Sequence, residues 1–98
     1  MNARIGTVSF SSDKADDVIR HVNEQIVPKY EEAQGYKGFT LLLDRSGGVG
    51  LGISFWDSED AMRATDGLGD QARQGVAEAG SGDDKGMQHF EVAIDTMA

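Results

Sequence analysis

The 98-residue chain has 39% hydrophobic and 27% charged residues, the composition of one globular domain spanning residues 1–98. It has no cysteine, which excludes disulfides and thiolate chemistry, and its net charge of −8 has the wrong sign for binding nucleic acid or an anionic membrane. The first twenty residues contain three aspartates and no apolar run, which predicts neither a signal peptide nor a membrane span and therefore a cytoplasmic location.

The N-terminal part of the chain predicts a strand followed by a kinked helix. Residues 4–10 alternate as a strand does, with Gly6 on one face and Thr7 on the other. Residues 11–13 supply oxygens for a helix N-cap. The helix stripe consists of Ala15, Val18, Ile19, Val22, Ile26, Tyr30 and Ala33. Pro28 lies inside this stripe and lacks an amide hydrogen, so a kink or a restart is expected there.

Residues 39–44 and 49–56 predict a β-hairpin with its turn at residues 45–48. Alternation places one set of side chains on the same face: Phe39, Leu41, Leu43, Gly50, Gly52, Ser54 and Trp56. The opposite face carries Thr40, Leu42, Leu51, Ile53 and Phe55. Because both faces bear apolar side chains, neither is suited to water, and a partner is expected to cover the face that the helices leave bare.

The C-terminal part predicts a second helix and a last strand. Asp57 and Ser58 cap a helix whose stripe is Ala61, Thr65, Leu68, Ala72, Val76 and Ala79. Glycines inside a helix cost about 1 kcal/mol each, so a break is expected near 67–69. Residues 80–86 are predicted to form a flexible acidic loop. Residues 87–95 then predict a strand with Phe90, Val92 and Ile94 on one face and His89, Glu91 and Ala93 on the other.

The element order β-α-β-β-α-β predicts an α+β fold, a ferredoxin-like antiparallel sheet with two helices on one face. The uncovered face of this sheet would be apolar. Two copies are therefore expected to pack sheet to sheet as a homodimer, which closes a dimeric α+β barrel.

Three passages resemble the antibiotic-biosynthesis-monooxygenase-like group of the dimeric α+β barrel superfamily: residues 28–39 with the motif GYKGF, residues 41–48 (LLLDRSGG) and residues 53–65 (ISFWDSEDAMRAT). The resemblance covers nearly the whole chain in element order. It implies a homodimer without a cofactor that oxidises an aromatic, polyketide-like or quinol-type small molecule. It also implies a lipophilic pocket between the sheet and the helices of each protomer.

The hairpin face bearing Trp56 is the one expected to line this pocket. Gly52 and Ser54 remove side-chain volume where Trp56, Phe39 and Leu41 supply apolar walls, which suits a flat aromatic ligand. The same pattern also fits an ordinary core in which glycines admit a helix and tryptophan is buried. The predicted substrate-binding residues are Phe39, Leu41, Gly52 and Thr7.

Oxygenation without a cofactor requires hydrogen bonds to a phenol or ketone oxygen and a base. The predicted catalytic residues are Ser54, Trp56 and His89. Ser54 is expected to donate a hydrogen bond to the substrate, and His89 is expected to act as the base. Thr7 and Ser9 are further donors, and Glu91 shares a face with His89 and is expected to orient it. His89 equally fits a structural role. The resemblance implies an asparagine and a tryptophan near this strand; Trp56 matches the tryptophan, whereas Gly52 stands at the asparagine position.

The sequence does not support haem degradation or metal binding. The resemblance implies that haem degradation needs an asparagine in the first strand and a tryptophan and a histidine in the second helix, but residues 4–10 and 61–79 lack them. His89 and Glu91 have no third ligand at a suitable spacing, so no metal site is predicted. His21 lies opposite the helix stripe and is expected to be exposed.

Two further functions stay open beside the oxygenase. One is a non-catalytic, small-molecule-binding or stress-responsive barrel, which the glycine at position 52 favours. The other is an isomerase or cyclase of polyketide-like substrates that uses a histidine or carboxylate base in a similar pocket.

Overall fold

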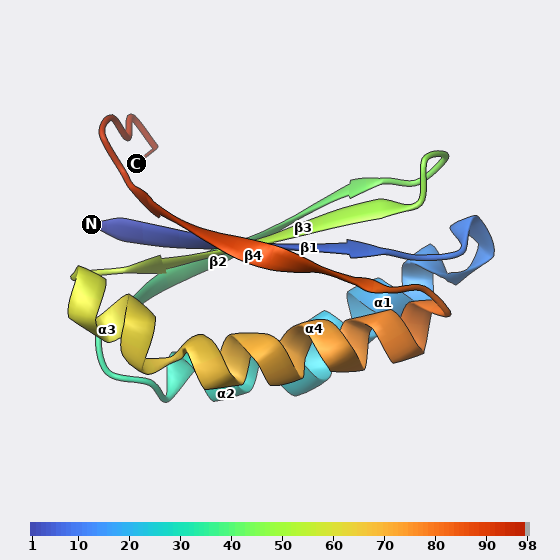
Figure 1. Ribbon diagram of the computed structural model, residues 1–98, viewed down its shortest axis with the longest axis horizontal. Coiled ribbons are helices and arrows are strands. Elements are labelled where there is room, and N and C mark those ends of the chain that lie inside the picture. Colours follow the sequence, from blue (N-terminus) through green and yellow to red (C-terminus); the bar gives the residue numbers. More distant parts are fainter. Residues whose placement is uncertain (98) are drawn as a thin grey trace.

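A computed structural model describes residues 1–97 and shows a four-stranded antiparallel sheet with the helices packed on one face (Figure 1). The elements in chain order are β1 (Asn2–Ser9), η1 (Ser12–Lys14), α1 (Ala15–His21), η2 (Val22–Ile26), α2 (Val27–Glu31), β2 (Tyr36–Asp44), β3 (Val49–Trp56), α3 (Glu59–Ala64), α4 (Asp66–Gly80) and β4 (Asp84–Glu91). The strands lie in the order β2-β3-β1-β4. The predicted ferredoxin-like fold is therefore confirmed. No helix in the described part of the chain is long and apolar enough to cross a membrane.

The first helical segment is irregular just before Pro28, where a kink was expected. α1 continues into η2, a five-residue π-helical stretch, and Pro28 then lies in the first turn of α2. A proline ring clashes with the carbonyl four residues earlier, and the wider π turn gives it room. The predicted cap is wrong in detail, because residues 12–14 form a 3-10 turn and Ser11 makes no side-chain cap bond within the described chain.

The second helical segment breaks at Thr65 rather than near residues 67–69. Ser58 caps α3 as predicted, accepting a hydrogen bond of 3.1 Å from the Ala61 amide. Thr65 leaves helical geometry, and its hydroxyl donates to the Met62 carbonyl at 2.8 Å while accepting from Arg4 at 2.9 Å. The break is therefore set by a contact with β1, and α4 runs on through its glycines.

β4 starts and ends earlier than the sequence predicted. It begins at Asp84, inside the expected loop, and ends at Glu91, so the predicted strand at residues 92–95 is wrong. β4 pairs only with β1, and Glu91 lies opposite Asn2, the first residue of that strand. Beyond this pair the Val92 amide donates one hydrogen bond of 2.9 Å to the Met1 carbonyl, and residues 92–97 form no strand.

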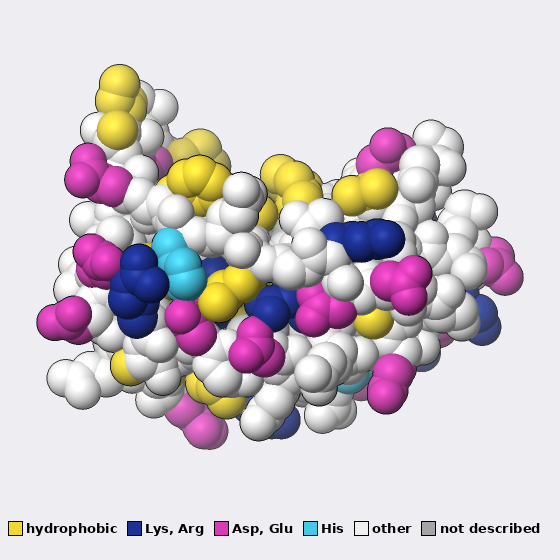
Figure 2. Space-filling model, viewed as in Figure 1, with side chains coloured by type: hydrophobic (Ala, Val, Ile, Leu, Met, Phe, Trp, Pro, Cys, Tyr) yellow, Lys and Arg dark blue, Asp and Glu magenta, His cyan; other side chains and the backbone are white. Residues whose placement is uncertain are grey.

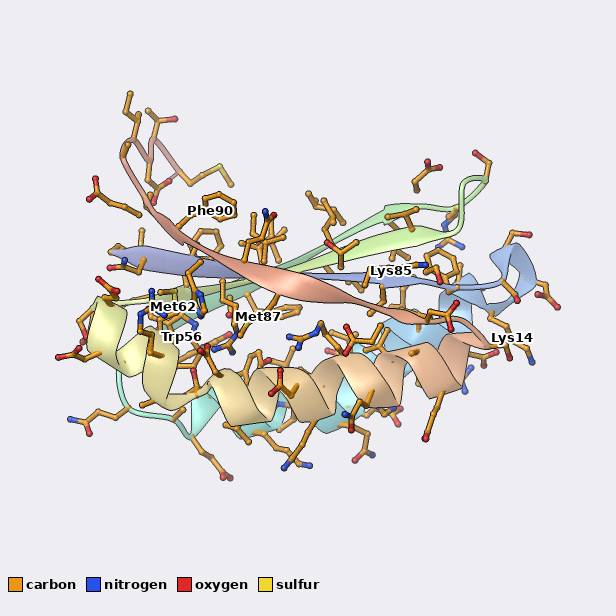
Figure 3. The ribbon with its side chains drawn as sticks, in the orientation of Figure 1. Lys14, Trp56, Met62, Lys85, Met87 and Phe90 are labelled. Atoms are coloured by element: carbon orange, nitrogen blue, oxygen red, sulfur yellow. The ribbon has the colours of Figure 1, made fainter. Side chains whose placement is uncertain are left out.

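The hairpin faces the helices as predicted. Gly52 of β3 lies opposite Leu41 of β2, and Trp56 is fully buried with 0% exposure. Figure 3 shows Trp56 and Met62 between the sheet and the helices, with Met87 on the same side and Phe90 pointing away from it. The predicted face therefore forms the core.

Nothing in residues 1–97 covers the opposite face of the sheet. Leu42 is 49% exposed, Phe90 is 44% exposed and Val49 is 39% exposed. Figure 2 shows apolar atoms along the rim that lies above the sheet, on the side away from the helices. This is the face for which the sequence predicted a partner.

Candidate functional site

A small cavity lies between the sheet and the helices. Its apolar wall includes Val8, Ile26, Tyr30, Phe39, Leu41 and Val76. Polar groups in its lining residues belong to Arg4, Ser54 and Arg73 and to the phenol of Tyr30, and none of the described lining residues is an aspartate or glutamate. The volume is about 50 Å³, room for a few water molecules. The site is therefore lipophilic, with buried hydrogen-bond donors.

A strip of glycines forms part of the sheet side of this cavity. Gly6 and Gly52 lie directly opposite each other in the β1–β3 ladder. A methyl group at Gly52 would lie 3.3 Å from the Phe39 ring, and one at Gly6 would lie 3.1 Å from Cδ of Arg73. Phe39 and Arg73 thus partly fill the volume that the glycines leave. The sequence was compatible with a ligand pocket or with an ordinary packed core, and this region has features of both.

Arg4 projects from β1 into the core and is only 2% exposed. Its Nη1 donates to the Met62 carbonyl at 2.9 Å, to the Thr65 hydroxyl at 2.9 Å and to Asp66 Oδ1 at 3.1 Å. Its guanidinium carbon lies 5.5 Å from the ring centres of both Tyr30 and Trp56, within the range of a cation–π contact. Nη2 is buried and has no hydrogen-bond partner among residues 1–97.

Asp66 joins Arg4 to His89. His89 Nε2 lies 2.9 Å from each carboxylate oxygen of Asp66, one of which also accepts from Arg4. Partial burial alone would raise the pKa of Asp66, but the hydrogen bonds and charges of His89 and Arg4 outweigh it and hold the pKa below its ordinary value. The expected pairing of His89 with Glu91 is not observed: the carboxylate that holds His89 is Asp66, which α4 carries, and Glu91 is exposed.

The structure brings together only some of the predicted site residues. Ser54, Phe39, Leu41 and Gly52 line the cavity. Trp56 is buried and is not a lining residue. It contacts the lining residue Ser54, because its indole Nε1 donates a hydrogen bond of 2.9 Å to the Ser54 hydroxyl.

Other predicted site residues lie elsewhere. His89 is not part of the cavity lining. Thr7 pairs with Leu51 on the bare face of the sheet, because neighbouring strand residues point to opposite sides, so it cannot line the cavity. Ser9 accepts a hydrogen bond from the Asp83 amide at 2.9 Å and holds the start of β4.

Sequence reasoning missed Arg4, Asp66 and Arg73. The signal for Arg4 was present, since it shares the core-facing side of β1 with Gly6, where a charge is unusual.

His21 was expected to be exposed but is half-buried beside Gly75, whose missing side chain leaves room for the imidazole. β1 begins at Asn2, so the first strand does contain an asparagine. The part of the argument against haem degradation that relied on its absence is therefore wrong. Within residues 1–97 no three His, Cys, Asp or Glu residues gather so as to hold a metal ion.

Comparison of the sequence with known proteins finds relatives of unknown function. No family model matches. The uncharacterised Mycobacterium tuberculosis proteins Rv2558 and Rv2557 are 35% and 33% identical over 63 residues, which is 64% of this chain. The chain spans only about a quarter of the length of these curated relatives, 27% and 28% respectively.

Comparison of the structure finds whole-chain likenesses. A candidate antibiotic biosynthesis monooxygenase from Deinococcus radiodurans aligns over 100% of both chains with a TM-score of 0.69 and 24% identity. A monooxygenase from the ActVA-Orf6 gene of Streptomyces coelicolor, in complex with nanaomycin D, has a TM-score of 0.74 and 14% identity over 99% of this chain and 91% of its own. The haem degrader MhuD of Mycobacterium tuberculosis, with two haems bound, has a TM-score of 0.74 and 18% identity over 99% of this chain and 100% of its own.

The chain therefore has the fold of the antibiotic-biosynthesis-monooxygenase-like proteins, the group that its sequence motifs resemble.

Proposed function

We propose that this protein binds a small aromatic molecule in the cavity between sheet and helices and oxidises it with O₂ without a cofactor. The observation that carries the proposal is an apolar cavity whose buried donors are the Ser54 hydroxyl and the Arg4 guanidinium. The monooxygenase of Streptomyces coelicolor, which has the same fold, is in complex with a small-molecule ligand, nanaomycin D. That likeness supports a ligand of this class.

The chemistry requires little of the protein. An anthrone loses a proton to a water molecule to give an enolate, and O₂ adds to the resulting carbanion. The peroxide anion takes a proton back from water, and the hydroperoxide then loses water to leave a quinone. One oxygen atom ends in the new carbonyl group and the other in water. Donors fixed beside the enolate oxygen stabilise the charge that develops there, and exclusion of water strengthens them.

The residues divide these tasks among them. Ser54 accepts from Trp56, so its own hydroxyl hydrogen is free to donate to the substrate oxygen. Arg4 supplies the positive charge, and Phe39 and Leu41 supply the apolar wall. We assign His89 a positioning role through Asp66, because it lies outside the lining.

A cavity of about 50 Å³ does not hold a fused tricyclic molecule as it stands. Phe39 and Arg73 fill the space above the glycines, and these two side chains would have to rotate away on binding. Binding by such a substrate is therefore expected to be slower than diffusion and accompanied by rearrangement of this wall.

Oxygen consumption tests the proposal. Purified protein is incubated with a panel of anthrones and hydroquinones, and O₂ uptake is followed with an electrode. Ser54→Ala should lower the rate about 10²-fold, the range for a lost oxyanion donor. Ser12→Ala, at an exposed position far from the cavity, is the matched control. Absence of uptake above the buffer rate across the panel would contradict the oxygenase.

A non-catalytic binding protein is the second candidate. It is favoured by the placement of His89, which is bonded to Asp66 and leaves the cavity without a histidine or carboxylate base among the described lining residues. This candidate predicts ligand binding without O₂ uptake, whereas the oxygenase predicts both.

We further propose that the bare sheet face is covered by a second copy, as the sequence predicted. Exposed Leu42, Val49 and Phe90 support this proposal, because apolar groups on one face gain most from burial against the same face of a twin. We do not extend the proposal to haem degradation, since α3 and α4 contain no tryptophan or histidine.

A further inference from the structure

We infer that Arg4 makes the cavity selective for a ligand with a carboxylate or a similar anionic oxygen group, which binds the Nε–Nη2 edge of the guanidinium. This inference rests on the proposed binding function and names the chemical class of the ligand more closely.

The hydrogen bonds of Arg4 leave one edge of its guanidinium for a ligand. The bonds to Met62, Thr65 and Asp66 all leave from Nη1. Nη2 is buried without a partner in the described chain. A methyl group at Gly69 would lie 2.8 Å from Nε, 3.1 Å from Cζ and 3.3 Å from Nη2. Gly69, which itself lines the cavity, therefore lies over the guanidinium plane on the side of this edge. Nε and Nη2 together form the fork that receives a carboxylate through two parallel bonds.

The charges around the cavity favour an anion. Two guanidinium groups line it, those of Arg4 and Arg73, and no acidic residue of the described chain does so. Arg73 already contacts Asp84 at 2.8 Å and also Asp70. Arg4 shares its single carboxylate, Asp66, with His89. The cavity thus presents guanidinium groups to a ligand, while the carboxylates that pair with them lie outside its described lining, in a chain with a net charge of −8.

Burial makes the free edge of Arg4 decisive for recognition. A buried donor without an acceptor is unfavourable, and a ligand that supplies the acceptor removes that cost. A neutral ligand with no acceptor at this position would leave Nη2 desolvated and without a hydrogen-bond acceptor. The apolar wall of Phe39 and Leu41 would then hold the ring of an aromatic acid whose carboxylate meets Arg4.

Calorimetric titration with two matched probes, 2-naphthoate and 2-naphthamide, tests the inference. They have the same ring and nearly the same size and differ in charge. The wild-type protein is expected to bind the acid at least tenfold more tightly than the amide, in line with the strength of charge-assisted pairs. Arg4→Gln should abolish this preference. Arg20→Gln removes the same charge from the exposed surface, where Arg20 contacts only Asp17 at 3.0 Å, and should retain the preference.

The outcomes separate the two proposals. Equal binding of both probes by the wild type would overturn the selectivity and leave the lipophilic cavity standing. Binding of neither probe would overturn the cavity as a ligand site and the selectivity with it. If Arg4→Gln fails to fold, as judged by circular dichroism, Gly69→Ala replaces it. That variant keeps the charge but crowds the guanidinium beside its Nε–Nη2 edge, and an unchanged preference for the acid would contradict the inference.

Discussion

The indole nitrogen of Trp56 donates a hydrogen bond of 2.9 Å to the hydroxyl of Ser54, two residues earlier on the same face of β3. Both side chains are buried, so each satisfies a polar group that water cannot reach. The bond also fixes the direction of the hydroxyl that lines the cavity. Trp56 therefore affects the site without touching it.

Replacement of Ser54 by alanine should destabilise the protein by about 1–3 kcal/mol, because the buried indole N–H loses its acceptor. In a Trp56→Phe background the same change should cost less, since that donor is already absent. Urea unfolding of the wild type, both single variants and the double variant measures the coupling. Additive effects of the two substitutions would show that this bond contributes nothing to stability.

Two glycines of α4 should respond in opposite ways to alanine. A methyl group at Gly69 would lie 2.8 Å from Nε of Arg4, which is tied to three partners, so Gly69→Ala should destabilise by about 1–3 kcal/mol. A methyl group at Gly67 has no atom within 4 Å, so Gly67→Ala should stabilise by about 0.5–1 kcal/mol through helix propensity. Thermal or urea unfolding compares them. Equal shifts for both variants would argue against a tight contact between Gly69 and Arg4.

Asp66 should make the folded state sensitive to acid. His89 and Arg4 hold its pKa below the ordinary value of 3.8 despite partial burial, so its charged form stabilises the folded state. This contribution is complete above the unfolded pKa and is lost as the pH falls through the lower, folded pKa. The stability of Asp66→Asn should consequently fall less steeply between about pH 5 and pH 2 than that of the wild type.

Asp13→Asn is the control for this acid titration, since Asp13 is an exposed carboxylate. Urea midpoints across the pH series would be compared for the three proteins. A slope for Asp66→Asn as steep as that of the wild type would contradict a role for the Arg4–Asp66–His89 contact in acid stability.

The bare sheet face should control the assembly state. Leu42 is 49% exposed on β2, and a lysine there would place a charge where the proposed second copy packs. Wild-type protein at micromolar concentration is expected to sediment with the mass of two chains, and Leu42→Lys should shift it toward one. Gln74→Lys makes a similar change in charge on the exposed side of α4 and should remain dimeric. A wild type that sediments as one chain would refute the proposed dimer.

The parts of the structure that local patterns decide were predictable. The alternation of residues 39–56 indicated which side chains face the helices, and the core contains Trp56 on that face. Pro28 marked the irregular helix because its covalent geometry acts locally. The end of β4 was not predictable in this way, because it depends on where β1 begins, at Asn2.

The candidate site was predicted only on the side that the hairpin contributes. Phe39, Leu41 and Ser54 followed from strand alternation. The contact of Arg4 with Asp66 joins residues 62 positions apart, and that of His89 with Asp66 joins residues 23 apart. No local spacing links residues so distant, whereas the two-residue spacing along one strand points from His89 to Glu91.

Trp56 is the only tryptophan in the chain, and its ring lies beside the guanidinium of Arg4. Indole emission changes with the charge and polarity around the ring. The protein therefore contains a built-in optical probe at the back of the cavity, one that needs no label. A shift in its fluorescence on adding a compound would signal that Arg4 has gained or lost a neighbour, and a library could be screened for ligands in this way before any reaction is known.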